Sequence, residues 1–328
     1  MHNVRLISCV GVEHDLPLLP FFLEHYLELG VAPSHMHIVL NASREGTEKM
    51  TRARSILETH GVEPEERWIE PYTSGGMWEK RREVQRRVAD ATDWVVSADV
   101  DEFHEYPAEL PTFLEYCERR EIDCVQGVFI DRVAPEGRLA AVAPTPSIWE
   151  QFPIETDVIC TIRSAEDGSY WYGTVNIMVC RGDVLPDRGG HHPFHRGPEM
   201  SYLLGCELAK FPPITNSAFR FAIPLRVHHF KWTDALVTSL RERLSTPGVS
   251  KAGKAYGELL LEYFDENDGI ALEGVPIKRD GGADSVPWRA RVSALRASTH
   301  IFSPVQSIRG TAAQYLRSAK KKAARWTP

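Results

Sequence analysis

The chain has 328 residues, of which 43% are hydrophobic, so it is long enough to bury the core of one large domain with additional helices. Its six cysteines are irregularly spaced and form no CxxC pair, which argues against a disulfide framework and against a thiolate zinc site. No uninterrupted run of about 18 apolar residues occurs, as a membrane-spanning helix would need. We therefore expect a soluble protein of a reducing, cytoplasmic compartment.

Charge is unevenly distributed along the chain. The net charge is -7, but residues 285–328 hold nine Lys or Arg and no Asp or Glu, which leaves -16 on the remainder. A basic terminus of this kind is either a solvated, frayed end or a contact for anionic lipid. We therefore expect peripheral membrane contact through this tail as one of two alternatives, and we expect no nucleic-acid partner.

The first third of the sequence alternates strand-like apolar runs with amphipathic stretches. This order predicts βαβ units and a mainly parallel sheet. Glycines follow two of the amphipathic stretches, at Gly30 and Gly61, where a helix-ending residue is expected. Strands are expected at 4–10, 36–40, 68–69 and 94–96, and helices at 16–29, 47–60 and 77–91.

The periodicity is weaker in the Pro- and Gly-rich region 135–197, where long functional loops are expected. Residues 1–235 are expected to form the nucleotide-binding and catalytic domain, and residues 236–328 a helical C-terminal extension with the basic tail. The expected elements of this second part are strands at 124–130, 158–162, 175–180 and 225–230, and helices at 109–119, 234–244 and 255–264.

An acidic cluster, Asp99-Val100-Asp101-Glu102, follows the apolar strand at 94–96. Open α/β folds bind ligands at the carboxyl edge of their parallel strands. Residues two apart on an extended segment point the same way, so Asp99 and Asp101 can converge on one hard cation. Such a cation would bridge the two phosphates of a nucleotide diphosphate and stabilise charge on the leaving group. The alternative is a helix-start or loop carboxylate cluster, because acidic residues also favour the first turn of a helix.

Several local motifs together resemble GT-A-fold glycosyltransferases of the family 2 and family 92 type, over roughly residues 4–235. They are Val12-Glu13, the Phe22 to Tyr26 segment, Asn41-Ala42-Ser43, Trp94 leading into Asp99-Val100-Asp101-Glu102-Phe103, Asp131-Arg132, Glu150-Gln151-Phe152-Pro153, Gly190-His191-His192 and His229-Phe230-Lys231. The chain departs from the commoner family 2 pattern at Gly11-Val12 and at Leu40.

The resemblance implies an α/β, GT-A-like fold with a mixed, mainly parallel sheet flanked by helices. It implies a glycosyltransferase of the hexosyltransferase type, in which an Asp-x-Asp motif holds Mn²⁺ or Mg²⁺ on the diphosphate of a nucleotide sugar. We expect a UDP-sugar first among donors and a carbohydrate or other hydroxyl acceptor, with transfer by inversion.

Metal and nucleotide contacts follow from the same resemblance. His229 matches a late histidine that would join Asp99 and Asp101 as a metal ligand. Neighbouring strand residues face opposite ways, so His228 should not reach the same cation. Lys231, on the same face as His229, would meet a phosphate oxygen. The alternative is a buried, hydrogen-bonded histidine beside a surface lysine.

Glu13 and Asn41, at the ends of the first two strands, would contact the nucleoside, together with Asp99 on the diphosphate side. The alternative for Glu13 and Asn41 is a helix- or turn-capping role. Glu102 would orient the metal ligands without binding the metal itself.

Inverting transfer needs a base that takes the proton of the acceptor hydroxyl. Asp131, at the end of the strand 124–130, is the first candidate, and an ion pair with Arg132 or a nearby base is its alternative. His191 and His192 are further candidates, because they follow two glycines on a loop that can approach a ligand closely. Glu199 is a fourth.

Two other functions would use the same residues. A metal-dependent phosphoester hydrolase would combine the carboxylates with the histidine-rich loop, and a catalytically silent protein would bind a nucleotide sugar without turnover. Zinc chemistry is disfavoured because no HxxxH helix with an adjacent glutamate is present. Residues 248–254 match GxxxxGK, but Ala255 replaces the Ser or Thr that binds Mg²⁺ and no strand precedes the match, so no phosphate loop is expected.

Overall fold

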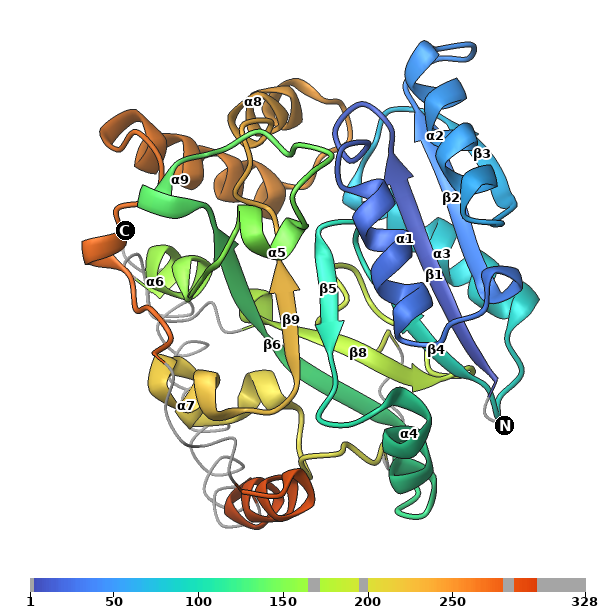
Figure 1. Ribbon diagram of the computed structural model, residues 1–328, viewed down its shortest axis with the longest axis vertical. Helices are drawn as coiled ribbons and strands as arrows, with labels where there is room; N and C mark the ends of the chain where they lie inside the picture. The colour runs from blue at the N-terminus through green and yellow to red at the C-terminus, as the bar shows by residue number, and fades with distance from the viewer. Residues whose placement is uncertain (1–2, 165–171, 195–199, 280–285, 300–328) are drawn as a thin grey trace, which may run out of the picture.

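A computed structural model describes residues 3–164, 172–194, 200–279 and 286–299 (Figure 1). Within these residues the strands form one nine-stranded mixed sheet of order β3-β2-β1-β4-β8-β6-β9-β5, with β7 paired to β6. The strands are β1 (Val4–Gly11), β2 (Met36–Ala42), β3 (Pro64–Ile69), β4 (Trp94–Ser97), β5 (Glu102–Glu105), β6 (Cys124–Val133), β7 (Ile154–Thr156), β8 (Val175–Arg181) and β9 (Arg226–His229).

Helices pack against the sheet, and the further helices α8 and α9 follow its last strand in the chain. The α-helices are α1 (Leu19–Glu28), α2 (Glu48–Thr59), α3 (Ser74–Val88), α4 (Leu110–Glu118), α5 (Ile148–Gln151), α6 (Val158–Ser164), α7 (Ser217–Ala222), α8 (Leu236–Ser245) and α9 (Lys251–Glu266). Short 3-10 turns lie at Pro33–His35, Pro135–Gly137, Tyr172–Thr174, Leu208–Lys210, Pro212–Thr215 and Leu272–Gly274. The expected α/β class, with a mixed sheet flanked by helices, is confirmed.

The N-terminal half of the sheet is parallel, as the alternating pattern predicts. β1 pairs in parallel with β2 and β4, and β2 pairs in parallel with β3. Alternate residues of β1 serve two cores: Leu6 and Val10 pack with α1 and α2, whereas Ile7 and Cys9 pack with α3. Because the chain crosses over by helices, the carboxyl ends of β1, β2 and β4 meet at one edge of the sheet.

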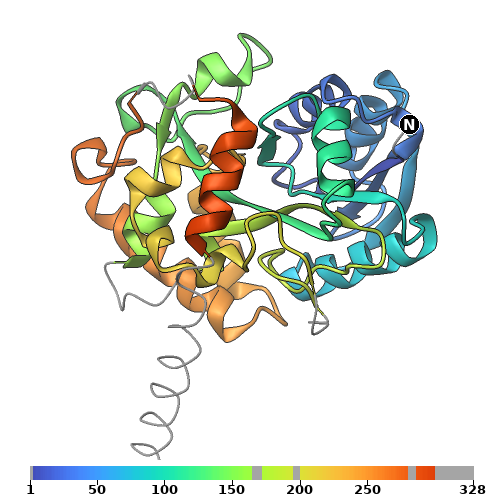
Figure 2. The same cartoon turned by 90° about the horizontal axis from the view of Figure 1, so that it is seen from below.

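The second half of the sheet is mixed. β6 and β9 run parallel, whereas β4–β8, β6–β8, β6–β7 and β5–β9 are antiparallel pairs. Between β4 and β5 the chain makes a turn and returns as a strand, so the helix-start alternative for the acidic cluster is wrong. Figure 2 shows the two halves side by side, the N-terminal part in blue and cyan and the later part in green to orange.

One expected strand is a helix. The segment 158–162 lies in α6, although its β-branched apolar residues indicate a strand. The helix starts where the Asp131 Oδ2 atom accepts a hydrogen bond from the Ile159 backbone N–H at 2.8 Å. Val158, Ile159 and Ile162 then pack in a cluster with Trp232. This tertiary contact outweighs the local strand propensity.

The C-terminal helices share that cluster with the sheet. α8 begins directly after residue 235, and Leu240 of α8 and Leu260 of α9 are buried against Val133 of β6. A helical segment at 288–299 packs Trp288 on Tyr116 of α4, with ring centroids 4.9 Å apart. The end of the basic tail, residues 300–328, lies outside the described residues. Among the helices that the structure describes, none is long and apolar enough to cross a membrane.

Candidate functional site

A cavity of about 1120 Å³ opens at the edge where the parallel strands end. Its wall includes Gly11 at the end of β1, Asn41 in β2 and Asp99 after β4. The sequence-predicted residues that line it are Glu13, Asn41, Asp99, Glu102, His191, His229 and Lys231. The topology therefore gathers residues that are up to 218 positions apart in the chain into one cavity.

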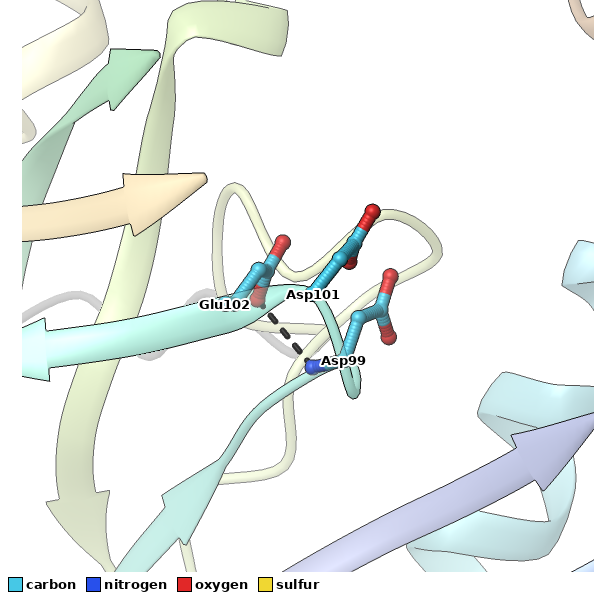
Figure 3. Close-up of side chains that lie close together, drawn as sticks. All are labelled: Asp99, Asp101 and Glu102. Carbon is cyan, nitrogen blue, oxygen red and sulfur yellow. Dashed lines mark hydrogen bonds between the residues drawn. The ribbon is translucent and has the colours of Figure 1, made fainter. Parts of the chain in front are cut away.

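Three carboxylates converge at the turn between β4 and β5. Asp99, Asp101 and Glu102 each offer one oxygen, and these oxygens all lie within 4.8 Å of one another (Figure 3). The turn is closed on itself, because the Asp99 N–H donates to Glu102 Oε2 at 3.2 Å and the Glu102 N–H donates to the Asp99 carbonyl at 3.0 Å. Oxygens at this spacing suit a hard divalent cation, whose oxygen ligands stand about 2.0–2.6 Å from the ion.

Glu102 is the buried member of the cluster. Its Oε2 atom also accepts from Asn176 Nδ2 at 2.8 Å, and its carbonyl accepts from the Tyr26 hydroxyl at 3.0 Å. Burial, together with the charges of Asp99 and Asp101, raises the pKa of Glu102 to about 8. The cluster therefore carries mutual repulsion that a bound cation would relieve.

Arg81 of α3 holds the opposite side of the cluster. One of its terminal nitrogens is 2.5 Å from Asp99 Oδ1 and 2.9 Å from the Ala98 carbonyl. The guanidinium is almost fully buried and stacks on Trp78, 4.8 Å from the ring centroid. Sequence reasoning missed this residue. The available signal is its position, because Arg81 falls on the buried face of α3 with Met77 and Val84.

His229 faces the cluster from β9. The register of β5 against β9 pairs Glu102 with His229, and His229 Nε2 lies 3.5 Å from Asp101 Oδ2. Burial alone would lower the pKa of His229, but the carboxylates of Asp101 and Asp131 outweigh it and raise that pKa to about 10. The structure thus brings the three predicted metal ligands, Asp99, Asp101 and His229, to one place.

The neighbouring histidine points away, as strand alternation predicts. His228 Nε2 lies 2.8 Å from Glu105 Oε2, and Arg226 contacts the same carboxylate at 3.1 Å. His228 is 4% exposed and does not line the cavity. It therefore belongs to the sheet's packing, and it is not a ligand of the carboxylate cluster.

Asp131 does not have the predicted role of catalytic base. Its Oδ1 atom accepts from His229 Nδ1 at 3.0 Å and from Trp232 Nε1 at 2.8 Å, while Oδ2 accepts from the Ile159 N–H. The side chain is fully buried and does not line the cavity, so an acceptor hydroxyl does not reach it. The alternative, an ion pair with Arg132 or a nearby base, is met by His229, whose Nδ1 atom lies 3.0 Å from Asp131 Oδ1, whereas Arg132 pairs with Glu155 at 2.8 Å. Asp131 positions His229.

The two histidines of the glycine-preceded loop have different surroundings. His191 lines the cavity, and its Nδ1 atom lies 2.8 Å from the Val175 carbonyl, a contact that places the ring proton on Nδ1 and leaves Nε2 as the basic nitrogen. Gly190 has a φ of +70°, and a Cβ there would lie 2.8 Å from Trp78, so glycine lets the loop approach α3. His192 pairs with Asp187 at 3.0 Å away from the cavity. Glu199 lies outside the described residues.

The predicted nucleoside contacts form the other end of the cavity. Glu13 Oε1 accepts from both the backbone N–H and the hydroxyl of Ser43 at 3.0 Å. Asn41 Nδ2 donates to the carbonyls of Trp68 and Glu70 at 2.9 Å each, and Asn41 is 1% exposed. Among the described residues, its buried Oδ1 atom has no hydrogen-bond partner. An amide oxygen held in this way is an acceptor for a donor group on a ligand.

Comparisons with known proteins give no family assignment. No protein-family model matches the chain, and no curated protein sequence matches it. The crystal structure of S. aureus TarS 1-349 is similar with a TM-score of 0.32 and 11% identity, covering 80% of this chain and 72% of that chain. A second crystal structure of S. aureus TarS gives 0.29 and 10%, covering 80% and 43%. Such distant similarity carries no conclusion about activity.

The Asp131→Asn substitution is expected to destabilise the protein by about 2–4 kcal/mol. The Asp131 carboxylate accepts three hydrogen bonds, from one backbone N–H and two ring N–H groups. In the amide of the variant an NH₂ group replaces one of the two oxygens, so at least one of these donors loses its acceptor. Urea unfolding followed by tryptophan fluorescence measures the loss. Asp183→Asn, at an exposed loop carboxylate, is the matched control. Equal stability of the two variants would show that the network around Asp131 contributes little.

The metal-free protein is expected to lose stability as the pH rises from about 6.5 to about 10. The pKa of His229 is near 6.5 when the chain is unfolded and about 10 when it is folded, so only the folded state holds this proton in that interval. The stabilisation that this His229 proton contributes is fully present below about pH 6.5. It is lost as the pH rises to about 10, and the free energy of unfolding falls by no more than about 1.4 kcal/mol per pH unit.

Urea unfolding at pH 6.5, 8 and 10 in the presence of a chelator tests this dependence. The decline should be smaller in His229→Gln than in the wild type and unchanged in the control His35→Gln. Titration of Glu102 also lowers the stability as the pH rises to about 8. The slopes of the wild type and His229→Gln are therefore compared between pH 8 and 10. Identical slopes there for wild type and His229→Gln would contradict the assignment.

Proposed function

We propose that the chain is a metal-dependent glycosyltransferase of the hexosyltransferase type, which moves a sugar from a nucleotide-diphosphate donor to an acceptor hydroxyl. The observation that carries this proposal is the convergence of Asp101 with Asp99 and His229, which line the cavity together with Glu13 and Asn41. A diphosphate at the carboxylate cluster would place its nucleoside toward Asn41 and its sugar toward the loop at His191.

The donor set fits Mn²⁺ or Mg²⁺. Carboxylate oxygens suit both ions, and an imidazole nitrogen suits Mn²⁺ more than Mg²⁺. When bound, the ion supplies positive charge against the leaving diphosphate. Arg81 fixes Asp99, and Asp131 fixes the His229 ring with Nε2 toward Asp101, so the protein side of the site is oriented before any ligand binds.

The nucleoside end offers an acceptor for the base of a nucleotide sugar, and a UDP-sugar is the donor that we propose. The free Oδ1 atom of Asn41 can accept a hydrogen bond from an N–H of a base. The Tyr72 ring lines the same end of the cavity and lies close to β1, since a Cβ on Gly11 would be 3.3 Å from the ring. The cavity is larger than the 300–1,000 Å³ of ordinary small-molecule sites. It therefore has room for a nucleotide sugar and for part of a carbohydrate or other hydroxyl acceptor.

His191 is the base that we propose for inverting transfer. Its Nε2 atom would take the proton of the acceptor hydroxyl while the hydroxyl oxygen bonds to the sugar and the sugar–diphosphate bond breaks. His192 is held by Asp187 outside the cavity and is a less suitable base. Membrane contact through the basic tail and a cytoplasmic location both stay predictions.

Thermal unfolding with UDP, GDP and CDP, each with and without Mn²⁺, tests the donor site. One nucleotide should raise stability in a Mn²⁺-dependent way, by about 2.7 kcal/mol at a concentration of 100 Kd, because it binds only the folded state. Asp101→Asn should abolish the metal-dependent part, and the exposed Asp183→Asn should retain it. The absence of any metal-dependent nucleotide effect in the wild type would contradict the proposal.

Turnover separates transfer from the two alternatives. Slow hydrolysis of one nucleotide sugar to free sugar, lost in Asp101→Ala, would support a glycosyltransferase. Phosphate release from simple phosphomonoesters at a higher rate would favour the hydrolase. Nucleotide binding without turnover across donors and acceptors would favour a silent binding protein.

A further inference from the structure

The helical hairpin α8–α9 forms a second wall of the same cavity. The hairpin reaches back to the nucleoside side at two points: Glu242 Oε2 of α8 lies 3.0 Å from His14 Nε2, and a Cβ on Gly248 in the connection would lie 3.8 Å from Thr73. The hairpin thus lies across the cavity from the ends of β1 and β2. The wall residues used below are Glu242, Arg243, Gly248, Ser250, Gly253 and Tyr256.

Two cations meet on one aromatic ring of this wall. Lys231 Nζ lies 4.8 Å from the centroid of the Tyr256 ring, and the Arg243 guanidinium carbon lies 5.9 Å from it. Both cations are half-buried and line the cavity. Within the part of the chain that the structure describes, neither has a carboxylate within 4.0 Å. Both cations therefore lie within about 6 Å of one ring in the cavity wall, where an anionic group of a ligand would be attracted to each of them.

The other polar groups of the wall already have partners. The carboxylate of Glu242, next to Arg243, is directed to His14. The N–H of Gly253 in the first turn of α9 donates to the Ser250 hydroxyl at 3.1 Å, so this helix end is capped. The GxxxxGK match at 248–254 therefore spans the end of a helix–helix connection and the first turn of α9, and α8 rather than a strand precedes it. Lys231 and Arg243 are the groups left to receive an anion.

We propose that Lys231, Arg243 and Tyr256 form a subsite for an anionic group of a substrate, a phosphate or a carboxylate. Its part in catalysis rests on the proposed function, whereas its binding of anions does not. Two sources share this chemistry: the diphosphate of the donor, and a charged group on the acceptor. Lys231 lies two residues after His229 and so connects the subsite to the carboxylate cluster, while Arg243 extends it onto the C-terminal hairpin.

A ³¹P NMR titration of methyl phosphate at constant ionic strength, using the full chain without nucleotide or metal, tests the subsite. Arg243→Gln should weaken binding about tenfold or more, because it removes a charge-assisted hydrogen bond to the anion. The matched control is Arg241→Gln, an exposed arginine on the same helix that does not line the cavity, and it should bind as the wild type does. Acetate should compete with methyl phosphate.

Repeating the titration with UDP and Mn²⁺ at saturation identifies the source. Undiminished methyl phosphate binding would assign the subsite to a charged acceptor, and displacement would assign it to the donor diphosphate. No specific binding to the wild type, or equal binding to Arg243→Gln, would overturn the subsite. If methyl phosphate binds in this way but no nucleotide does, the proposed function fails and the subsite stands.

Discussion

The carboxylate of Asp131 is completely buried and accepts hydrogen bonds from the His229 ring, the Trp232 ring and the start of α6. A buried carboxylate is costly unless its oxygens are fully hydrogen-bonded, and these three donors meet that requirement. The same bonds fix the His229 ring with its other nitrogen toward Asp101. One internal anion therefore connects the sheet, the helix α6 and the side of the site that faces the carboxylate cluster.

The cluster itself is a balance of opposing charges. Asp99, Asp101 and Glu102 repel one another at short range, and the fold sets Arg81 against one side and His229 against the other. These two cations come from elements on opposite sides of the turn, α3 and β9. A divalent ion bound from the cavity side would complete the balance, because burial and the charges of Asp99 and Asp101 raise the pKa of Glu102 to about 8.

The sequence predicts the parallel half of the fold well, because regular alternation of apolar strands and amphipathic helices is a local property. It also places the acidic cluster, since a carboxylate pair after a buried strand must arrive at the sheet edge. The strand expected at 158–162 is wrong because a distant carboxylate, Asp131, starts a helix there. Local propensity contains no information about such a contact.

The errors at the site have the same origin. Asp131 was assigned as the base from its place at a strand end, but its burial depends on β9 and α6 packing over it. In the sequence, Arg81 is one of several charged residues on a predicted helix. Only the folded structure shows that it lies beside Asp99. The wall formed by α8 and α9 lies outside the region of family resemblance, so no motif could indicate that it borders the same cavity.

Electron paramagnetic resonance of Mn²⁺ with the full chain and ¹⁷O-enriched UDP tests the central claim most directly, because it reports whether metal and diphosphate are joined at the protein. The account predicts one bound Mn²⁺ per chain whose lines broaden with the labelled phosphates, and loss of this signal in both Asp101→Asn and His229→Gln but not in Asp183→Asn. Binding of Mn²⁺ that survives both site substitutions, or no binding with any nucleotide, would contradict it.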